Sequence, residues 1–237
     1  MLTLLLTILK GWARMNNLEM QELLNNIRSD VKQYKPIVIE LHKNFSKGNY
    51  KLLEVGADTR TIQNLIPKNI TYHSLDFGKE HTFPFNLDDG KFPIKDNTYD
   101  IIVCTETLEH VMYPHRVMKE MLRVAKKGAV FFISQPNEYN FLQRIYYLMG
   151  KKPPITDETY MVVEKHQHIH RPRVCDIINL ISTHLKIEKV WYIWQSRQSG
   201  HGKLRAVARG VDKLIENLAS VQPSLFSRLV LVKARKV

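Results

Sequence analysis

The 237-residue sequence contains little cysteine. Its two cysteines, Cys104 and Cys175, lie 71 positions apart. This matches neither a CxxC pair nor the dense cysteine pattern of a small secreted scaffold. The scarcity excludes a disulfide-stapled fold and is typical of a reducing compartment. We therefore expect a cytoplasmic protein whose cysteines both pack in the core.

A long apolar run is also missing. In the opening segment MLTLLLTILKGWARM about nine residues are apolar, well below the ~20 that a membrane-spanning helix needs. The segment lacks the basic start and the small-residue cleavage site of a signal peptide. Two interpretations stay open for residues 1–14. In the first, these residues form a weak interfacial anchor that gives peripheral membrane contact, since leucines and Trp12 share one helical face. In the second, translation starts at Met15.

Acidic residues are scarce in the C-terminal third. Residues 1–150 carry 19 Lys and Arg against 16 Asp and Glu, whereas residues 151–237 carry 16 against 7. This excess would steer an anionic small molecule, nucleic acid or an acidic membrane surface towards the protein. A solvated basic surface is the other interpretation, because no RGG, RS or polybasic run concentrates the charge.

Short apolar segments alternate with helical ones. The segments YKLLEV, NITYHSL, YDIIVCT and GAVFFIS are apolar throughout, which indicates parallel strands covered on both faces. We predict a doubly wound α/β domain. Helices are expected within 17–45, over 114–127 between Pro114 and a closing Gly128, and over 138–149, 173–184 and 204–218. Two more strands are expected at IEKVWYIWQ and SRLVLVKAR.

Polar residues follow the first two strands. Glu54 ends the first strand and Gly56 comes directly after it, and Asp76 ends the second strand 20 residues later. Ligands of such sheets bind beyond the carboxyl ends of the strands, and this is the spacing at which a carboxylate reaches ribose hydroxyls. A turn-forming Asp at a strand end is equally common, so neither signal decides alone.

A longer stretch is more specific. FNLDDGKFPIKDNTYDIIVCTETLEHVMYPHRVMKEMLRVAKKGAVFFISQPN, Phe85 to Asn137, resembles the class I S-adenosylmethionine-dependent methyltransferases of the methyltransferase type 11-like group. The resemblance continues more loosely from about Lys51 to the C-terminus. It implies a Rossmann-like, mostly parallel seven-stranded sheet with helices on both faces and an antiparallel C-terminal strand. It also implies a helical extension over 1–46 and a methyltransferase domain over 47–237, with an acceptor-pocket insertion at about 136–172.

The resemblance also implies roles for residues. Glu54 and Gly56 would lie by the methionine part of S-adenosylmethionine, Asp76 would hold the ribose hydroxyls, Asn86 and Leu87 would meet the adenine, and Thr105 would line the floor below the sulfonium. One departure is visible. The family's GxGxG loop is GADTR here, with Asp58 and Arg60 at the later glycine positions, which leaves a catalytically silent binding protein as an alternative.

The insertion is aromatic and rich in histidine. Six aromatic or methionine side chains between Tyr139 and Tyr160 are candidates for an acceptor lid, and we expect Phe141 and Leu148 to be core. The tract HQHIH at 166–170 has a metal-binding composition, although alternating histidines are more often surface residues.

The segment ETLEH after the fourth strand has the remaining candidates. Glu106, Glu109 and His110 have i, i+3, i+4 spacing and would share one side of a helical turn. In some relatives an ExxEH segment helps to hold a divalent metal, and HQHIH could add a histidine. In most relatives the same letters occur without metal. We predict no metal, with His110 as the base or orienting group and Glu109 beside it.

The predicted activity is therefore transfer of a methyl group from S-adenosylmethionine to an oxygen of a small molecule or of a glycan or lipid-linked intermediate. The alternative enzyme is an RNA 2′-O-methyltransferase, for which the basic C-terminal third would bind nucleic acid.

Overall fold

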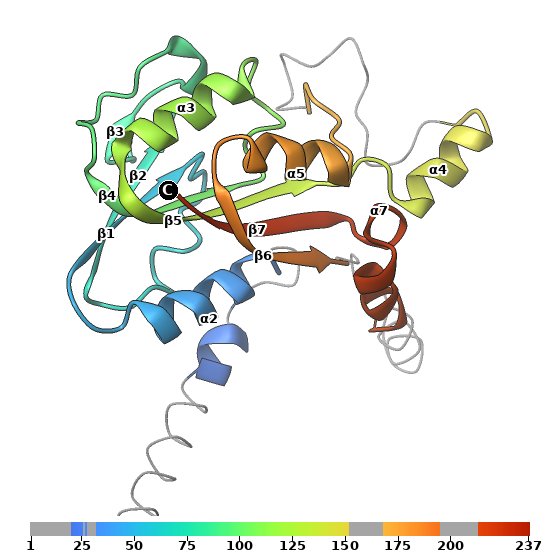
Figure 1. The fold of residues 1–237 in the computed structure, drawn as a ribbon, viewed down its shortest axis with the longest axis horizontal. Helices are drawn as coiled ribbons and strands as arrows, with labels where there is room; N and C mark the ends of the chain where they lie inside the picture. The colour runs from blue at the N-terminus through green and yellow to red at the C-terminus, as the bar shows by residue number, and fades with distance from the viewer. Residues whose placement is uncertain (1–19, 26, 28–31, 152–167, 195–212) are drawn as a thin grey trace, which may run out of the picture.

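A computed structural model describes residues 20–25, 27, 32–151, 168–194 and 213–237 of the chain. The sheet has seven strands in the order β3-β2-β1-β4-β5-β7-β6 (Figure 1). The strands are β1 (Tyr50–Val55), β2 (Ile70–Asp76), β3 (Phe83–Pro84), β4 (Tyr99–Thr105), β5 (Ala125–Pro136), β6 (Lys186–Ile193) and β7 (Leu229–Arg235). The predicted extension 1–14, residues 152–167 of the predicted insertion and residues 204–212 of the predicted helix 204–218 lie outside the described residues.

Strand pairing confirms the predicted Rossmann-like sheet. The strands β1 to β5 pair in parallel, whereas β7 inserts antiparallel between β5 and β6. The C-terminal antiparallel strand is therefore present. Within the described residues, no helix is both long and apolar enough to cross a membrane.

Helices cover both faces of the sheet, which explains why its central strands are apolar throughout. The helices α3 (Pro114–Val124) and α5 (Val174–Ser182) lie on one face and α2 (Tyr34–Asn44) on the other (Figure 1). Neighbouring strand residues enter different cores: Ile102 packs in the core that contains Met121 of α3, and Ile101 in the core that contains Ile37 of α2. A strand that is buried on both faces does not alternate between polar and apolar residues.

The predicted end of the helix that begins at Pro114 was wrong. The helix that was expected to run to Lys127 ends at Val124, and Gly128 lies within β5. The cause is tertiary: Ala125 is extended and pairs with Tyr99 of β4, and the Lys126 ammonium donates to Asp100 at 2.7 Å. Cys175 was also misplaced, since it is exposed, whereas Cys104 is buried.

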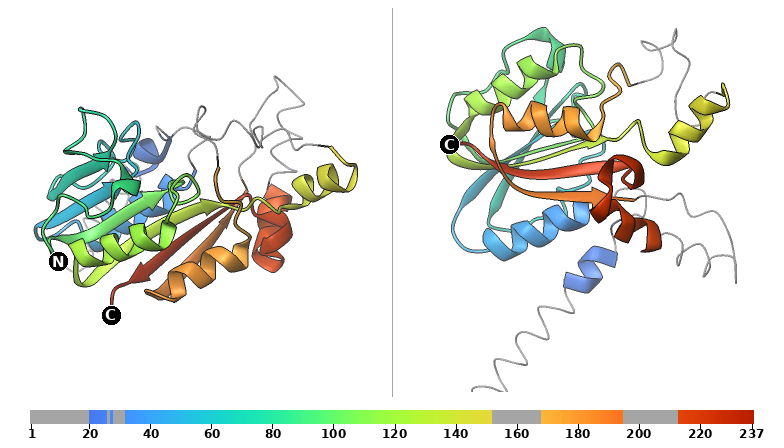
Figure 2. Two further views of the ribbon diagram at one scale, coloured as in Figure 1. Left: turned by 90° about the horizontal axis from the view of Figure 1, so that it is seen from above. Right: turned by 45° about the vertical axis from the view of Figure 1, so that its right-hand side comes forward.

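The helix α4 (Phe141–Leu148) projects beyond the end of the sheet in both views of Figure 2. The Asn140 side chain caps its first turn. Phe141 anchors it by stacking on Trp194, with a ring-centroid distance of 5.5 Å, and by contacting Phe226. The prediction that Leu148 belongs to the core was wrong, because 88% of this residue is exposed. The Phe141 contacts hold the start of α4 against the body of the protein.

Candidate active site

A cavity of about 570 Å³ opens at the carboxyl ends of the parallel strands. It is bordered by the loop after β1, the loop after β2, the 86–88 turn and the turn after β4. These segments bring Gly56, Asp76, Asn86, Leu87 and His110 to one place. Strand ends of a doubly wound sheet are where ligands bind, because the connecting loops diverge there.

Gly56 is the point where the first loop passes closest to its neighbours. Its φ is +69°, and a Cβ at this position would lie 2.2 Å from the Thr107 hydroxyl oxygen. Its N–H donates to the Leu75 carbonyl at 2.9 Å. A side chain would therefore be excluded both by backbone conformation and by space.

The two later positions of the GADTR loop keep a glycine-like backbone. Asp58 has a φ of +35° and Arg60 a φ of +53°, which side chains rarely adopt. The Arg60 guanidinium donates to the Glu80 carbonyl at 2.9 Å. The loop thus follows a path that glycine would favour, while the Arg60 side chain binds the neighbouring loop.

The Asp76 carboxylate joins two loops at the cavity wall. It accepts the Asp58 N–H at 2.8 Å and the Phe77 N–H at 2.7 Å. Each carboxylate oxygen can accept two hydrogen bonds, so Asp76 keeps capacity for hydroxyl donors.

Asn86 and Leu87 border the same cavity, but the Asn86 amide is used locally. Its oxygen accepts the Asp88 N–H and its nitrogen donates to Asp89, both at 3.0 Å. It therefore caps the 3₁₀ turn Leu87–Asp89. Asp88, which sequence reasoning missed, accepts the Met112 N–H at 2.9 Å and so ties this turn to the loop after β4.

Glu54 and Thr105 lie buried and are not among the described residues that border the cavity. Glu54 accepts hydrogen bonds from Tyr34 at 3.2 Å and Tyr72 at 2.5 Å, and Tyr34 lies 2.9 Å from the Thr105 hydroxyl. Burial raises the pKa of Glu54 to about 7, although both tyrosine hydrogen bonds act against this. The predicted positions thus belong to one buried network, with Tyr34 contributed by α2.

The ETLEH segment does not form the helix that its spacing requires. Residues 106–112 are bends and turns, because Glu106 has a φ of +49° and its N–H donates to Ser134 of β5 at 3.0 Å. Glu106 borders the cavity and accepts a hydrogen bond from Gln33 at 3.0 Å. His110 also borders the cavity, whereas Glu109 is fully buried. The expectation of three side chains on one helical side was therefore wrong.

Glu109 lies directly behind His110. One carboxyl oxygen is 4.0 Å from His110 Nε2, and neither oxygen has a hydrogen-bond partner among the described residues. Burial is the main cause that raises the pKa of Glu109 to about 8. A carboxyl group in this state can hold or accept a proton near neutrality, next to an imidazole that reaches the cavity.

His168 completes a cluster with these two residues. Its ring lies 4.8 Å from the His110 ring, and its Nδ1 lies 2.5 Å from Glu138, which also accepts from Gln143. Burial lowers the pKa of His168, but the hydrogen bond to Glu138 and the charge of Glu109 outweigh it, so the net shift is upward. His168 was expected at the surface; it is instead half-buried against the turn after β4. Only the tertiary structure brings His168 next to Glu138 and His110.

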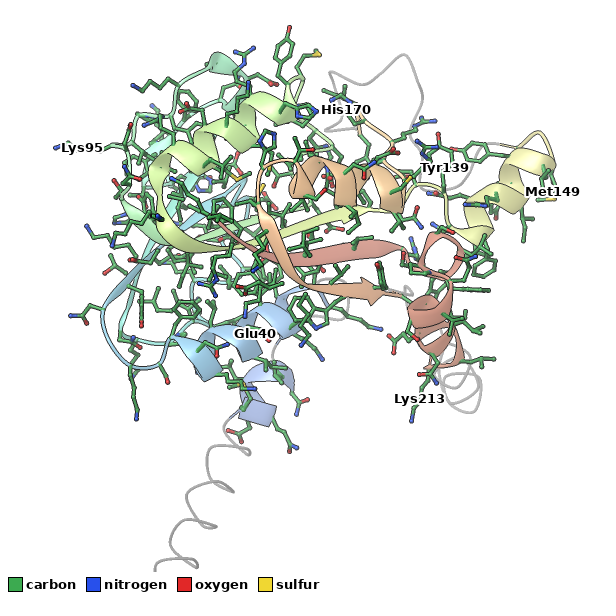
Figure 3. All side chains as sticks on the ribbon, viewed as in Figure 1. Glu40, Lys95, Tyr139, Met149, His170 and Lys213 are labelled. Carbon is green, nitrogen blue, oxygen red and sulfur yellow. The ribbon has the colours of Figure 1, made fainter. Side chains whose placement is uncertain are left out.

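One ligand atom each from Glu109, His110 and His168 lies within 4.8 Å of the others. Glu106 is not part of this group. His170, which Figure 3 labels, binds the same turn from outside, since its Nε2 lies 3.0 Å from the Val111 carbonyl oxygen. His166 lies outside the described residues.

The sequence of residues 25–183 matches a family described as a methyltransferase domain. The chain belongs to this family. It is an S-adenosylmethionine-dependent methyltransferase, and S-adenosylmethionine is its cofactor. The residues of the cavity fit this molecule, because a side-chain-free approach at Gly56 and a carboxylate at Asp76 suit a nucleoside with ribose hydroxyls.

The methyltransferase resembles one known protein in sequence and others in three-dimensional structure. It is 37% identical over 57 residues to norajmaline N-methyltransferase from Rauvolfia serpentina, a match that covers 24% of this chain and only 20% of that relative. The solved structure of an S-adenosylmethionine-dependent methyltransferase from Mesorhizobium loti has a TM-score of 0.56 at 14% identity, covering 88% of this chain and all of the other.

Two further structures show the same fold. A methyltransferase from Aquifex aeolicus has a TM-score of 0.51 at 12% identity and covers 92% of this chain and 97% of its own. The [4+2]-cyclase SpnF has the same score and identity, covering 85% of this chain and 80% of its own. Because a named cyclase shares the fold, the acceptor chemistry must be argued from the site and not from the architecture.

Proposed function

We propose that the methyltransferase acts on an oxygen of its acceptor, with His110 receiving the acceptor's proton. The observation that carries this proposal is an imidazole on the cavity wall with a buried carboxyl group 4.0 Å behind it. A hydroxyl acceptor must lose its proton to become a good nucleophile, and histidine is suited to receive it near neutral pH. Glu109 would orient the ring and, when ionised, stabilise its charged form.

The remaining predicted residues would position the reactants. Bound S-adenosylmethionine supplies a methyl group on a positively charged sulfur. Asp76 would accept hydrogen bonds from its ribose hydroxyls, and Leu87 and the turn capped by Asn86 would border its adenine. Glu54 and Thr105 would support the floor through their hydrogen bonds to Tyr34. Catalysis would then come mostly from holding the acceptor in line with the methyl carbon.

We propose a cytoplasmic enzyme whose acceptor is a small molecule or a glycan or lipid-linked intermediate. The surface of α4 supports the lipid-linked case. Leu142, Ile145 and Leu148 are exposed along one side of the helix, and Met149 extends this stripe at its outer end (Figure 3). Residues 139–156 contain three basic residues and no acidic one. An exposed apolar stripe with basic neighbours is suited to peripheral contact with an anionic membrane.

Replacing His110 tests the proposed role. His110→Ala should lower turnover by roughly 10² or more, because proton transfer to a positioned base contributes about that factor. Calorimetry should show nearly unchanged affinity for S-adenosylhomocysteine. The matched control is His42→Gln on α2, a half-buried histidine that is bonded to the Leu65 carbonyl and does not border the cavity, and its turnover should stay at the wild-type level.

The same assay separates the roles of the cluster. If a chelator abolished wild-type turnover and Mg²⁺ or Mn²⁺ restored it, the cluster would hold a metal and His110 would be a ligand instead of a base. Full turnover of His110→Ala would equally contradict the proposal.

A further inference from the structure

A second cavity, of about 600 Å³, lies at the start of α3. Its basic side chains are Arg116, Lys119, His115 and His170, and Met112 and Tyr113 form an apolar part of the wall. None of the residues that border it, among those described, is acidic. The cavity therefore combines positive charge with an apolar surface.

Among the described residues, no carboxylate forms a salt bridge with the two permanent charges of this basic cavity. Arg116 lies over the Tyr113 ring at 4.4 Å and donates only to the Asp88 carbonyl, at 3.3 Å. In the part of the chain that the structure describes, neither Arg116 nor Lys119 forms a salt bridge. Arg123, two turns further along the same helix, binds Glu120 at 2.7 Å and Asp96 at 2.6 Å. Among the described residues, Arg123 near the end of α3 is thus salt-bridged, whereas Arg116 and Lys119 near its beginning are available to bind an anion.

The start of a helix is an unfavourable place for such cations. The positive end of the helix dipole lies there, yet the first turn of α3 holds no acidic residue and no side chain caps it. Burial, followed by the charges of His115 and Lys119, lowers the pKa of the neighbouring His184. An anion placed among Arg116, Lys119 and the helix end would relieve all of this repulsion at once.

The basic cavity lies next to the cofactor cavity. His110 and Val111 border the cofactor cavity, and the next two residues, Met112 and Tyr113, border the basic cavity. One turn of the chain therefore separates the proposed proton acceptor from the basic side chains.

We propose that the basic cavity binds a phosphate group of the methyl acceptor, an inference that rests on the proposed function. Arg116 would bind two phosphate oxygens with its planar fork, Lys119 would add a point charge, and the Met112 and Tyr113 side chains would contact the apolar part attached to the phosphate. The acceptor is then a phosphorylated molecule, either soluble or carried by a lipid.

Phenyl phosphate is a probe that has both an anion and a ring. It should bind the enzyme saturated with S-adenosylhomocysteine, with phenol binding roughly 10-fold or more weakly in calorimetry. The double variant Arg116→Gln with Lys119→Gln should weaken phenyl phosphate binding by roughly 10- to 100-fold, because two charge-assisted contacts are lost. S-adenosylhomocysteine affinity should be unchanged.

The matched control removes two exposed charges elsewhere, as Lys47→Gln with Lys68→Gln, and should bind the probe as the wild type does. Equal losses in both double variants would overturn the proposal, because the probe would then respond to net charge alone. Competition between phenyl phosphate and S-adenosylhomocysteine would also overturn it, since the probe would lie in the cofactor cavity.

Vesicles distinguish the two sources of phosphate. If the Arg116 and Lys119 variant also loses binding to phosphatidylglycerol vesicles, the phosphate is that of a lipid headgroup; if vesicle binding is unchanged, it belongs to a soluble acceptor. The proposed function fails separately. Intact phosphate binding together with full turnover of His110→Ala would refute the role of His110 and leave the basic cavity supported.

Discussion

Replacing Glu109 by glutamine should change how the free energy of unfolding depends on pH. Glu109 is fully buried, its carboxyl oxygens have no hydrogen-bond partner among the described residues, and burial raises its pKa from 4.5 to about 8. Between these two pH values the unfolded chain releases the proton that the folded chain keeps. Stability must then fall as pH rises through this window.

The size of this effect follows from the shift. One pKa unit corresponds to about 1.36 kcal/mol, so a rise from 4.5 to about 8 sets a ceiling of about 5 kcal/mol. Glutamine has nearly the same shape and releases no proton. The variant and the wild type should therefore have similar stability near pH 5, and the variant should be more stable by up to about 5 kcal/mol near pH 9.

Urea unfolding followed by tryptophan fluorescence at several pH values would measure this difference. The control is Glu22→Gln, the same chemical change at an exposed position, which should leave the stability close to that of the wild type. The difference curve for Glu109 describes the whole cluster, because the charges of His168 and Glu138 act on its carboxyl group.

Two results would refute this reasoning. A flat difference between Glu109→Gln and the wild type would mean that the carboxyl group titrates alike in the folded and unfolded chains. A wild type that gains stability over the variant as pH rises would mean that the folded protein prefers the carboxylate. If this reversal appeared only after Mn²⁺ was added, the carboxylate would be a metal ligand.

Further predictions concern the cofactor cavity and the acceptor. Gly56→Ala should lower the free energy of unfolding by about 2 kcal/mol or more, because its Cβ would lie 2.2 Å from the Thr107 hydroxyl at a φ of +69°; thermal unfolding would show it, and an unchanged midpoint would contradict it. Arg60→Gly should raise stability by up to about 1 kcal/mol in the same assay, since it relieves a φ of +53°, whereas a loss would mean that the Glu80 contact dominates. Asp76→Ala should weaken S-adenosylhomocysteine binding in calorimetry by about 1 to 3 kcal/mol for each ribose hydrogen bond lost, and unchanged affinity would exclude that role. Binding of RNA, if it is the acceptor, should fall steeply as salt rises; salt-sensitive, length-dependent binding would favour the RNA methyltransferase over the proposed acceptors.

The sequence by itself determined the architecture and the location of the site. Strands that are apolar on both faces require cover on both faces, so YKLLEV and YDIIVCT were sufficient to indicate a parallel sheet with helices around it. Gly56 and Asp76 could be placed at the cavity because Gly56 directly follows β1 and Asp76 ends β2, and the ends of parallel strands meet at one edge. Such inferences depend only on neighbours along the chain and on the period of the strand.

Only the tertiary structure decided which polar groups share a partner. Tyr34 reaches Glu54 from 20 positions away and His168 reaches Glu138 from 30, and no local pattern marks either pair. The ETLEH spacing predicted one helical face, but the Glu106 N–H bonds to the Ser134 carbonyl of β5 and the chain then bends instead of forming a helix, with Glu109 buried and His110 at the cavity. Local propensity is worth tenths of a kcal/mol per residue, whereas strand pairing and the burial of a charged group are worth more, and therefore the contacts between distant segments decided the chemistry of the site.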